Sequence, residues 1–293
     1  MIIDSHQHFW HVSRTDYGWL TPDNTVLYRN YQPADLSPIL SDNSIDATVL
    51  IQAAPSEAET RYLLELARAH SFIAGVVGWV DFASAEVVQD VESLILDGGG
   101  MLKGLRPMIQ DIAEAHWLLR PQLDIAFQTM IRHGLVFDAL VRPRQLKALR
   151  SRLVRHPELR AVLDHAGKPC IEQGDSDDWA QDMECLARDT NISVKLSGIL
   201  TEAGCRSSFE QLSPYMEHVF RCFGVDRILW GSDWPVLNLA SDYGTWLKLS
   251  RALVKRFAPL EEDAIFARTA ARLYCLDVPP KGRQQARLQE LPA

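Results

Sequence analysis

Short runs of β-branched and other apolar residues alternate with longer amphipathic segments along most of the chain. The short runs have the length and composition of strands, and the segments between them carry apolar residues at helical spacing. Repeated strand–helix units of this kind are typical of a parallel sheet covered by helices. The predicted strands lie at residues 2–8, 47–52, 73–80, 102–106, 135–138, 161–165, 192–197 and 227–231.

Residues that begin or end helices mark several of the segments between these runs. Ser56 and Glu59 have the spacing of an N-terminal capping box ahead of an apolar helical stretch. Gly98 to Gly100 and Gly134 each follow a helical stretch, where glycine commonly ends a helix. The helices are therefore predicted to fill the gaps between the strands.

About eight strands in one uninterrupted alternation predict an α/β fold, a (β/α)8 TIM barrel that forms a single domain over residues 1–277. An open doubly wound sheet is the alternative, but the first strand-to-helix turn lacks the G-x-G-x-x-G motif that seats a dinucleotide phosphate. An irregular aromatic insert that includes Trp19, Tyr28 and Tyr31 is predicted to cover the mouth of the barrel. Residues 278–293 form a polar C-terminal tail, predicted to lie outside the domain.

Composition and charge narrow the classes of partner and the compartment. The net charge is -8 and no basic cluster occurs, which argues against nucleic acid or an anionic membrane as a partner. The five cysteines are odd in number, scattered and never in C-x-x-C spacing, as in a reducing compartment. No signal-peptide pattern and no apolar run of membrane-spanning length is present. We expect a cytoplasmic protein with a small-molecule substrate, and the oligomeric state stays open.

Polar residues stand at the C-terminal ends of most predicted strands, where a barrel enzyme carries its chemistry. His6 and His8 lie two positions apart on the first strand, so both imidazoles project to the same face. A purely structural core would have apolar or small residues at most of these positions. The strand-end residues are His6, His8, Gln52, Arg106, Asp138, His165, Lys195 and Asp233.

Each of these residues also has a structural interpretation. Lys195 can extend its charged end out of the barrel, Asp138 can cap a helix beginning near Pro143, and Arg106 can pair with Asp138. Asp233 can cap a short helix after the Gly-Ser-Asp-Trp-Pro turn. That all of them are structural at once is much less plausible than a shared site.

The ordered motifs resemble the amidohydrolase-2 branch of the amidohydrolase superfamily. The matching motifs are His6-x-His8, DHAGKP around His165, KLSG around Lys195, GSDWP around Asp233 and the closing segment IFARTAARLY. Within that branch, HFWHV, KGLRPM and HWLLRP resemble the sugar-lactone hydrolases of the L-fuconolactonase and L-rhamnonolactonase type, which are related to 2-pyrone-4,6-dicarboxylate lactonase. The resemblance spans residues 1–277 and implies a distorted barrel with its active site at the strand C-termini.

The resemblance also bears on the metal content. Family members with two metals carry a lysine or glutamate ligand on the fourth strand and a histidine on the fifth, where this chain has Arg106 and Asp138. A guanidinium has no free lone pair to give a metal. We therefore expect one Zn²⁺ held by His6, His8 and Asp233, with His165 as a further candidate ligand, or no metal at all.

The expected activity is hydrolysis of a sugar lactone, such as L-fuconolactone, to the sugar acid. In this hypothesis Asp233 is the base for the attacking water, while His165 and Arg106 polarise the carbonyl. The expected substrate-binding residues are Gln52, Trp19, Trp79, Asp138, Lys195 and Trp234. Two alternatives stay open: a metal-dependent decarboxylase of an unsaturated or aromatic acid on the same fold, and a non-catalytic barrel that binds sugar acids.

Overall fold

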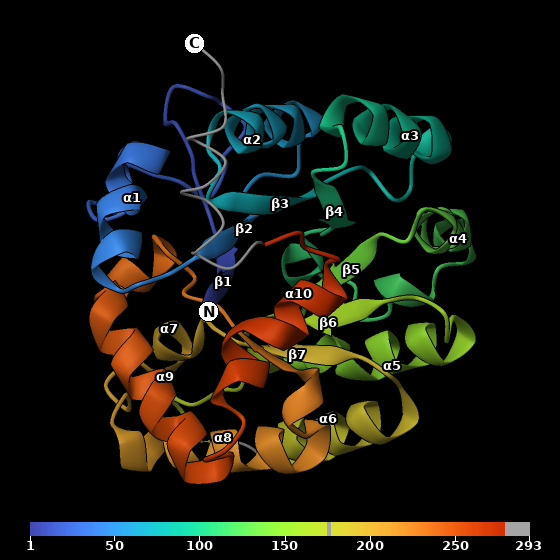
Figure 1. Ribbon diagram of the computed structural model, residues 1–293. Helices are drawn as coiled ribbons and strands as arrows, with labels where there is room; N and C mark the ends of the chain where they lie inside the picture. Colours follow the sequence, from blue (N-terminus) through green and yellow to red (C-terminus); the bar gives the residue numbers. More distant parts are fainter. Residues whose placement is uncertain (175–176, 279–293) are drawn as a thin grey trace.

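The computed structural model describes residues 1–174 and 177–278, and within them eight parallel strands form one sheet in chain order. Helices follow the strands around the outside of the sheet (Figure 1). The strands are β1 (Ile3–Gln7), β2 (Ala47–Ile51), β3 (Ile73–Gly78), β4 (Leu102–Leu105), β5 (Val136–Ala139), β6 (Ala161–Leu163), β7 (Ser193–Leu196) and β8 (Ile228–Trp230). The helices are α1 (Pro33–Asp42), α2 (Glu57–Ala69), α3 (Val87–Gly98), α4 (Asp124–His133), α5 (Leu146–Arg155), α6 (Asp177–Asp189), α7 (Ile199–Ala203), α8 (Phe209–Phe223), α9 (Tyr243–Phe257) and α10 (Thr269–Leu273).

The seam between β1 and β8 closes beyond the ends of the two strands. The amide of His8 donates to the carbonyl of Trp234 at 2.8 Å, and the amide of Asp233 donates to the carbonyl of His6 at 2.8 Å. The other neighbouring strands pair in parallel, with register shifts in the first three pairs, from β1 to β4, and none in the pairs from β4 to β8. The expected distorted (β/α)8 barrel is thus confirmed, and its irregular seam joins the His-x-His motif directly to the segment that carries Asp233.

A separate apolar layer fills the barrel near the start of its strands, because small and β-branched side chains such as Ile3, Ala47 and Val49 point inward there. The helix α10 lies across this end and adds Ala270 and Tyr274 to the layer (Figure 1). The larger core lies between the strands and the outer helices. Since the N-terminal end is filled by apolar side chains, polar chemistry is confined to the opposite end.

The predicted helix boundaries are present, with one difference at α2. Ser56 caps this helix by accepting from the amide of Glu59 at 3.1 Å. The Glu59 carboxylate does not complete the capping box; it accepts from the amides of Ala53 and Ala54 at 2.9 Å each. Glu59 therefore fixes the loop that follows β2.

The aromatic insert between β1 and β2 lies over the end of β2. The Trp19 indole N–H donates to the carbonyl of Ala53 at 2.7 Å, and the Trp10 indole N–H donates to that of Arg29 at 2.8 Å. Of the predicted polar tail, residues 279–293 lie outside the described residues. Among the described helices, none combines the length and the apolar character that crossing a membrane requires.

Candidate active site

Three histidines and an aspartate converge at the C-terminal end of the barrel. The Nε2 atoms of His6 and His8 are 3.2 Å apart, and Asp233 Oδ1 lies 3.6 Å from the first and 3.4 Å from the second. His165 Nε2 lies 3.9 Å from the same carboxylate oxygen. His8, His165 and Asp233 line a cleft of about 250 Å³, with Arg106 also in its wall.

Gly231, next to His6 across the seam between β8 and β1, stands where a larger residue would not fit. A Cβ atom at Gly231, directly after β8, would lie 2.7 Å from the Cβ of His6. The glycine therefore lets the His6 side chain lie against the end of β8. The turn that follows holds Asp233 at a φ of 61°, in the left-handed region.

The loop after β6 holds His165 in an unusual conformation. His165, Ala166, Gly167 and Lys168 have φ values of 53°, 49°, 69° and 54°, so four successive residues are left-handed. Non-glycine residues adopt this region at a cost of roughly 1–2 kcal/mol each, and such strain persists where surrounding contacts enforce it. Here the Trp179 indole N–H donates to the Ala166 carbonyl at 2.8 Å, and Lys168 donates its amide to the carbonyl of His165 at 2.9 Å.

The hydrogen bonds of the histidines fix which ring nitrogens can act in the cleft. His8 Nδ1 donates to the carbonyl of Ile51 at 2.8 Å, which turns its Nε2 toward His6 and Asp233. Burial, followed by the nearby Lys195 ammonium, holds the pKa of His6 well below its ordinary value. Burial also lowers the pKa of His165 to about 4. His6 and His165 are therefore neutral at neutral pH.

Asp233 stays ionised in this setting. Burial alone would raise its pKa, but the neighbouring His165, His8 and His6 together hold the pKa well below the usual range for an aspartate. The carboxylate is thus a permanent negative charge in the cleft at physiological pH.

A second layer of charged residues lies beneath the histidines, and all of it is completely buried except Arg106, which reaches the wall of the cleft. Lys195 Nζ lies 2.6 Å from Asp138 Oδ2 and 3.0 Å from Asp164 Oδ1, and Arg106 Nη1 lies 3.2 Å from Asp164 Oδ2. The Tyr274 hydroxyl, from the end of α10, donates to Asp138 at 2.7 Å. Lys195 therefore does not extend out of the barrel, Asp138 does not cap the helix near Pro143, and Arg106 pairs with Asp164 instead of Asp138.

The sequence-predicted substrate residues separate into two groups. Trp19 lines the cleft, and Trp79 lines a neighbouring hollow. The others are buried and do not line the cleft: Gln52, Asp138, Lys195 and Trp234. Gln52 donates to the carbonyl of Arg106 at 2.6 Å, and Trp234 packs against aromatic rings of the core.

Three residues of the site were not singled out from the sequence. Asp164 joins Arg106, His6 and Lys195, although its only sequence signal is a carboxylate directly after the apolar run of β6. Ser197 lies 2.9 Å from His165 Nδ1 through its hydroxyl. Lys168 lines the cleft and donates to Glu202 Oε1 at 2.8 Å, a pairing that no sequence spacing indicates.

The geometry of the histidine–aspartate cluster fits one metal ion. Ligand atoms bonded to zinc at about 2.1 Å in a tetrahedron are about 3.4 Å apart. The measured separations from Asp233 Oδ1 to the three imidazole nitrogens run from 3.4 to 3.9 Å. Arg106 Nη1 also lies 3.2 Å from His6 Nε2, so a positive charge stands beside this set of ligand atoms. Among the described residues, the cluster is thus one that could hold a single ion.

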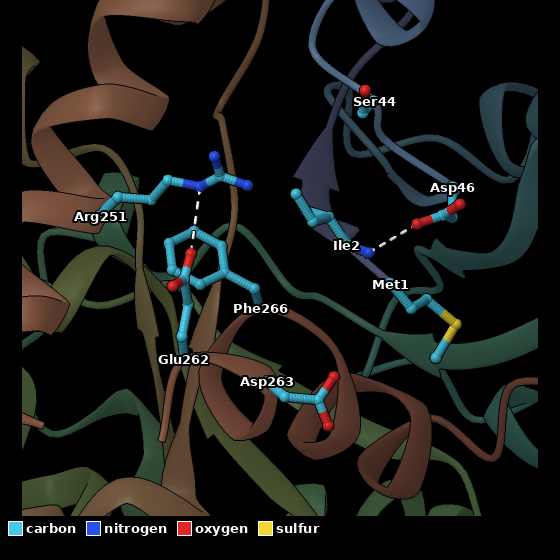
Figure 2. A pocket seen from close by; sticks show the side chains of 8 residues that line it. All are labelled: Met1, Ile2, Ser44, Asp46, Arg251, Glu262, Asp263 and Phe266. Carbon is cyan, nitrogen blue, oxygen red and sulfur yellow. Dashed lines mark hydrogen bonds and ion pairs between the residues drawn. The ribbon is translucent and has the colours of Figure 1, made fainter. Parts of the chain in front are cut away.

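A larger hollow, of about 570 Å³, lies at the other end of the barrel (Figure 2). Its charged groups are already paired: Arg251 Nε lies 3.2 Å from Glu262, and the amide of Ile2 donates to Asp46 at 2.7 Å. No histidine occurs among the described residues that line it. We therefore place the active site at the histidine-lined cleft.

Comparison with known proteins identifies the family. The model of the amidohydrolase family matches residues 3–276. The chain belongs to this family. This amidohydrolase is 42% identical to an L-fucono-1,5-lactonase of Burkholderia ambifaria, over 97% of the chain and 98% of that protein. It is 35% identical to an L-fucono-1,5-lactonase of Burkholderia multivorans, over 96% of the chain and 98% of that protein.

The solved structures agree with this assignment. The amidohydrolase superimposes with a TM-score of 0.88 on a crystal structure of an amidohydrolase from Burkholderia multivorans with bound zinc, at 33% identity over 94% of the chain and all of that one. The family resemblance predicted from the sequence motifs is therefore confirmed, as is the prediction of a hydrolase.

Proposed function

We propose that this amidohydrolase hydrolyses a sugar lactone, such as L-fucono-1,5-lactone, to the corresponding sugar acid. The observation that carries the proposal is the ionised Asp233 carboxylate, set among imidazoles at 3.4 to 3.9 Å in a cleft that Arg106 also lines. This set combines a proton acceptor with donors that can stabilise negative charge. The two relatives described above are lactonases, which supports a lactone as the substrate class.

The proposed reaction uses groups already in the wall of the cleft. Asp233 takes a proton from water as the water oxygen bonds to the lactone carbonyl carbon. Arg106 supplies positive charge near the carbonyl oxygen, and its Nε has no hydrogen-bond partner among the described residues. The neutral His165 polarises the same oxygen. The ring C–O bond then breaks, and the ring oxygen leaves as a hydroxyl with the proton that Asp233 held.

One divalent metal fits this proposal, although the reaction sequence above is written for the protein groups alone. His6, His165 and Asp233, whose ligand atoms lie within 4.8 Å of one another, would hold the ion, with His8 beside them as a further candidate. It would supply Lewis-acid chemistry, making water in the cleft more acidic and opposing the charge that develops on the carbonyl oxygen. His8 Nε2 is already turned toward this position by the hydrogen bond from Nδ1 to Ile51.

The buried residues first expected to touch the substrate receive a different proposed role. Lys195 and Asp138 lie below the histidines, with Lys195 Nζ 3.2 Å from His6 Nδ1. We assign both to positioning His6 and Asp164. Gln52 positions Arg106 by donating to the main-chain carbonyl of Arg106. Trp234 supports the turn that carries Asp233. Trp19 stays the proposed aromatic contact in the cleft itself.

The test is the Asp233→Asn variant, which keeps the shape of the side chain and removes its charge. We expect the rate of lactone hydrolysis to fall by at least about 10³-fold while the protein stays folded. The rate is measured as proton release across a panel of aldonolactones. Asp263→Asn, at the opposite end of the barrel, is the matched control and should keep native rates. If Asp233→Asn retains more than about a tenth of the activity, the base assignment is wrong. Release of CO₂ from aromatic acids without lactone turnover would favour the decarboxylase.

A further inference from the structure

A second hollow adjoins the active-site cleft. It has a volume of about 530 Å³ and lies beyond the ends of β3 and β4. Three residues, Trp19, Met108 and Asp111, line both the hollow and the cleft. The two spaces therefore lie side by side and share part of their walls.

Three tryptophans are among the residues that line this hollow. They are Trp19, Trp79 and Trp117. The Trp19 ring is fixed by its hydrogen bond to Ala53, and the main chain of Trp79 is held on both sides by the Thr60 hydroxyl, at 2.8 and 3.1 Å. Trp117 is almost buried, so its ring has little freedom to move. Rigid indoles that expose one face offer an apolar surface with little loss of side-chain entropy on binding.

The charge of the hollow differs from that of the cleft. Asp16, Asp81 and Asp111 line it, and no lysine or arginine is among the described residues that line it, although Arg14 pairs with Asp16 at 2.7 Å. The cleft, in contrast, contains Arg106 and Lys168. A hollow of this composition disfavours an anionic group and offers carboxylate acceptors to hydroxyl donors. Asp111 is exposed at the junction of the two spaces, where it can accept from a hydroxyl on either side.

We propose that the hollow is a second subsite, which binds an uncharged sugar ring linked to the lactone. Indole faces suit the C–H faces of such a ring, and the carboxylates suit its hydroxyls. The cleft alone, at about 250 Å³, lies below the roughly 300–1,000 Å³ typical of small-molecule sites, whereas cleft and hollow together fall within that range. The inference rests on the proposed lactonase activity and extends it to glycosylated aldonolactones.

The test compares matched one-ring and two-ring substrates. D-Glucono-1,5-lactone is assayed beside aldobionolactones that carry a second hexose through 1→3, 1→4 or 1→6 linkages, with the uncatalysed rate subtracted. Ala83→Trp places a large ring in the hollow, and because Ala83 is exposed the substitution removes no core contact. Ala85→Trp adds the same ring two residues further along the same exposed turn, outside the hollow, and is the matched control.

We expect at least one aldobionolactone to exceed the one-ring lactone in kcat/KM by about tenfold or more. Ala83→Trp should abolish that gain and leave one-ring turnover within about twofold, while Ala85→Trp should change neither. If no two-ring substrate exceeds its one-ring counterpart, or if the gain survives Ala83→Trp, the subsite is refuted. If the native enzyme hydrolyses no lactone at all, the lactonase function is refuted, and the subsite with it.

Discussion

Lys195 offers a direct test of the charged layer beneath the active site. Its ammonium is completely buried and lies 2.6 Å from Asp138 Oδ2, 3.0 Å from Asp164 Oδ1 and 3.2 Å from His6 Nδ1. Lys195→Met keeps most of the length of the side chain and its apolar stem, and removes only the charge and the donors. Two buried carboxylates then lose their shared cation.

The expected cost follows from that geometry. Removing one partner of a buried ion pair typically destabilises a protein by about 3–5 kcal/mol, because the remaining charge stays desolvated. In a domain of this size such a loss corresponds to a fall in Tm of about 5–8 °C. Asp138→Asn in the same chain should return part of the stability, since Asp164 keeps Arg106 as a partner and the carboxylate that lost its cation is then neutral.

Thermal and urea unfolding of Lys195→Met, measured together with lactone kinetics, show whether Lys195 positions other residues or contacts the substrate. Lys147→Met is the matched control: its ammonium is largely exposed and 4.0 Å from Asp182, so we expect a change below about 0.5 kcal/mol. If Lys195 touches the substrate as the sequence first suggested, Lys195→Met will raise KM and leave Tm unchanged. That result would refute the two-layer description of the site.

Three further predictions concern His165, the loop after β2 and the metal. Gly198→Ala should lower kcat by about 100-fold, because the new Cβ would lie 2.4 Å from His165 Nδ1 and displace that ring. Gly134→Ala is the control: it has similar backbone strain but open space around the new Cβ, so kcat should not change. Burial raises the pKa of Glu59 to about 8, so the folded protein keeps a proton that the unfolded chain releases near pH 4.5. The free energy of unfolding should therefore fall by a few kcal/mol as the pH rises from about 5 to 8, and urea titrations of Glu59→Gln should show a flatter profile. Elemental analysis should find at most one metal per chain, and two equivalents would contradict the single-site geometry.

The strand pattern and the strand-end rule were enough to locate the site. Parallel strands followed by helices place all strand C-termini at one end of a barrel, so His6, His165, Arg106 and Asp233 had to gather there. The two-residue spacing of His6 and His8 correctly predicted that their rings converge, since their Nε2 atoms are 3.2 Å apart. These features depend on local periodicity, which a single sequence contains.

Depth within the barrel could not be predicted in the same way. Spacing along a strand gives the end and the face of a residue, but not whether another side chain covers it. Asp138 and Lys195 stand at strand ends like Arg106, yet they are fully buried because Tyr274 reaches Asp138 from a helix 136 positions later. Their role in substrate contact was predicted from position alone, and position alone does not distinguish the two layers.

The two layers of the site differ in how their charges are paired. In the lower layer, the cations Arg106 and Lys195 are matched by the carboxylates Asp138 and Asp164 at 2.6 to 3.2 Å. Asp233 stands above this balanced layer and lines the cleft, with the imidazoles of His6, His8 and His165 at 3.4 to 3.9 Å. Its pKa lies well below the usual range, so the carboxylate is ionised where water and substrate enter the cleft. Asp138 and Asp164 are instead paired with a buried cation, which explains why Asp233 is the carboxylate of this cluster suited to act on water.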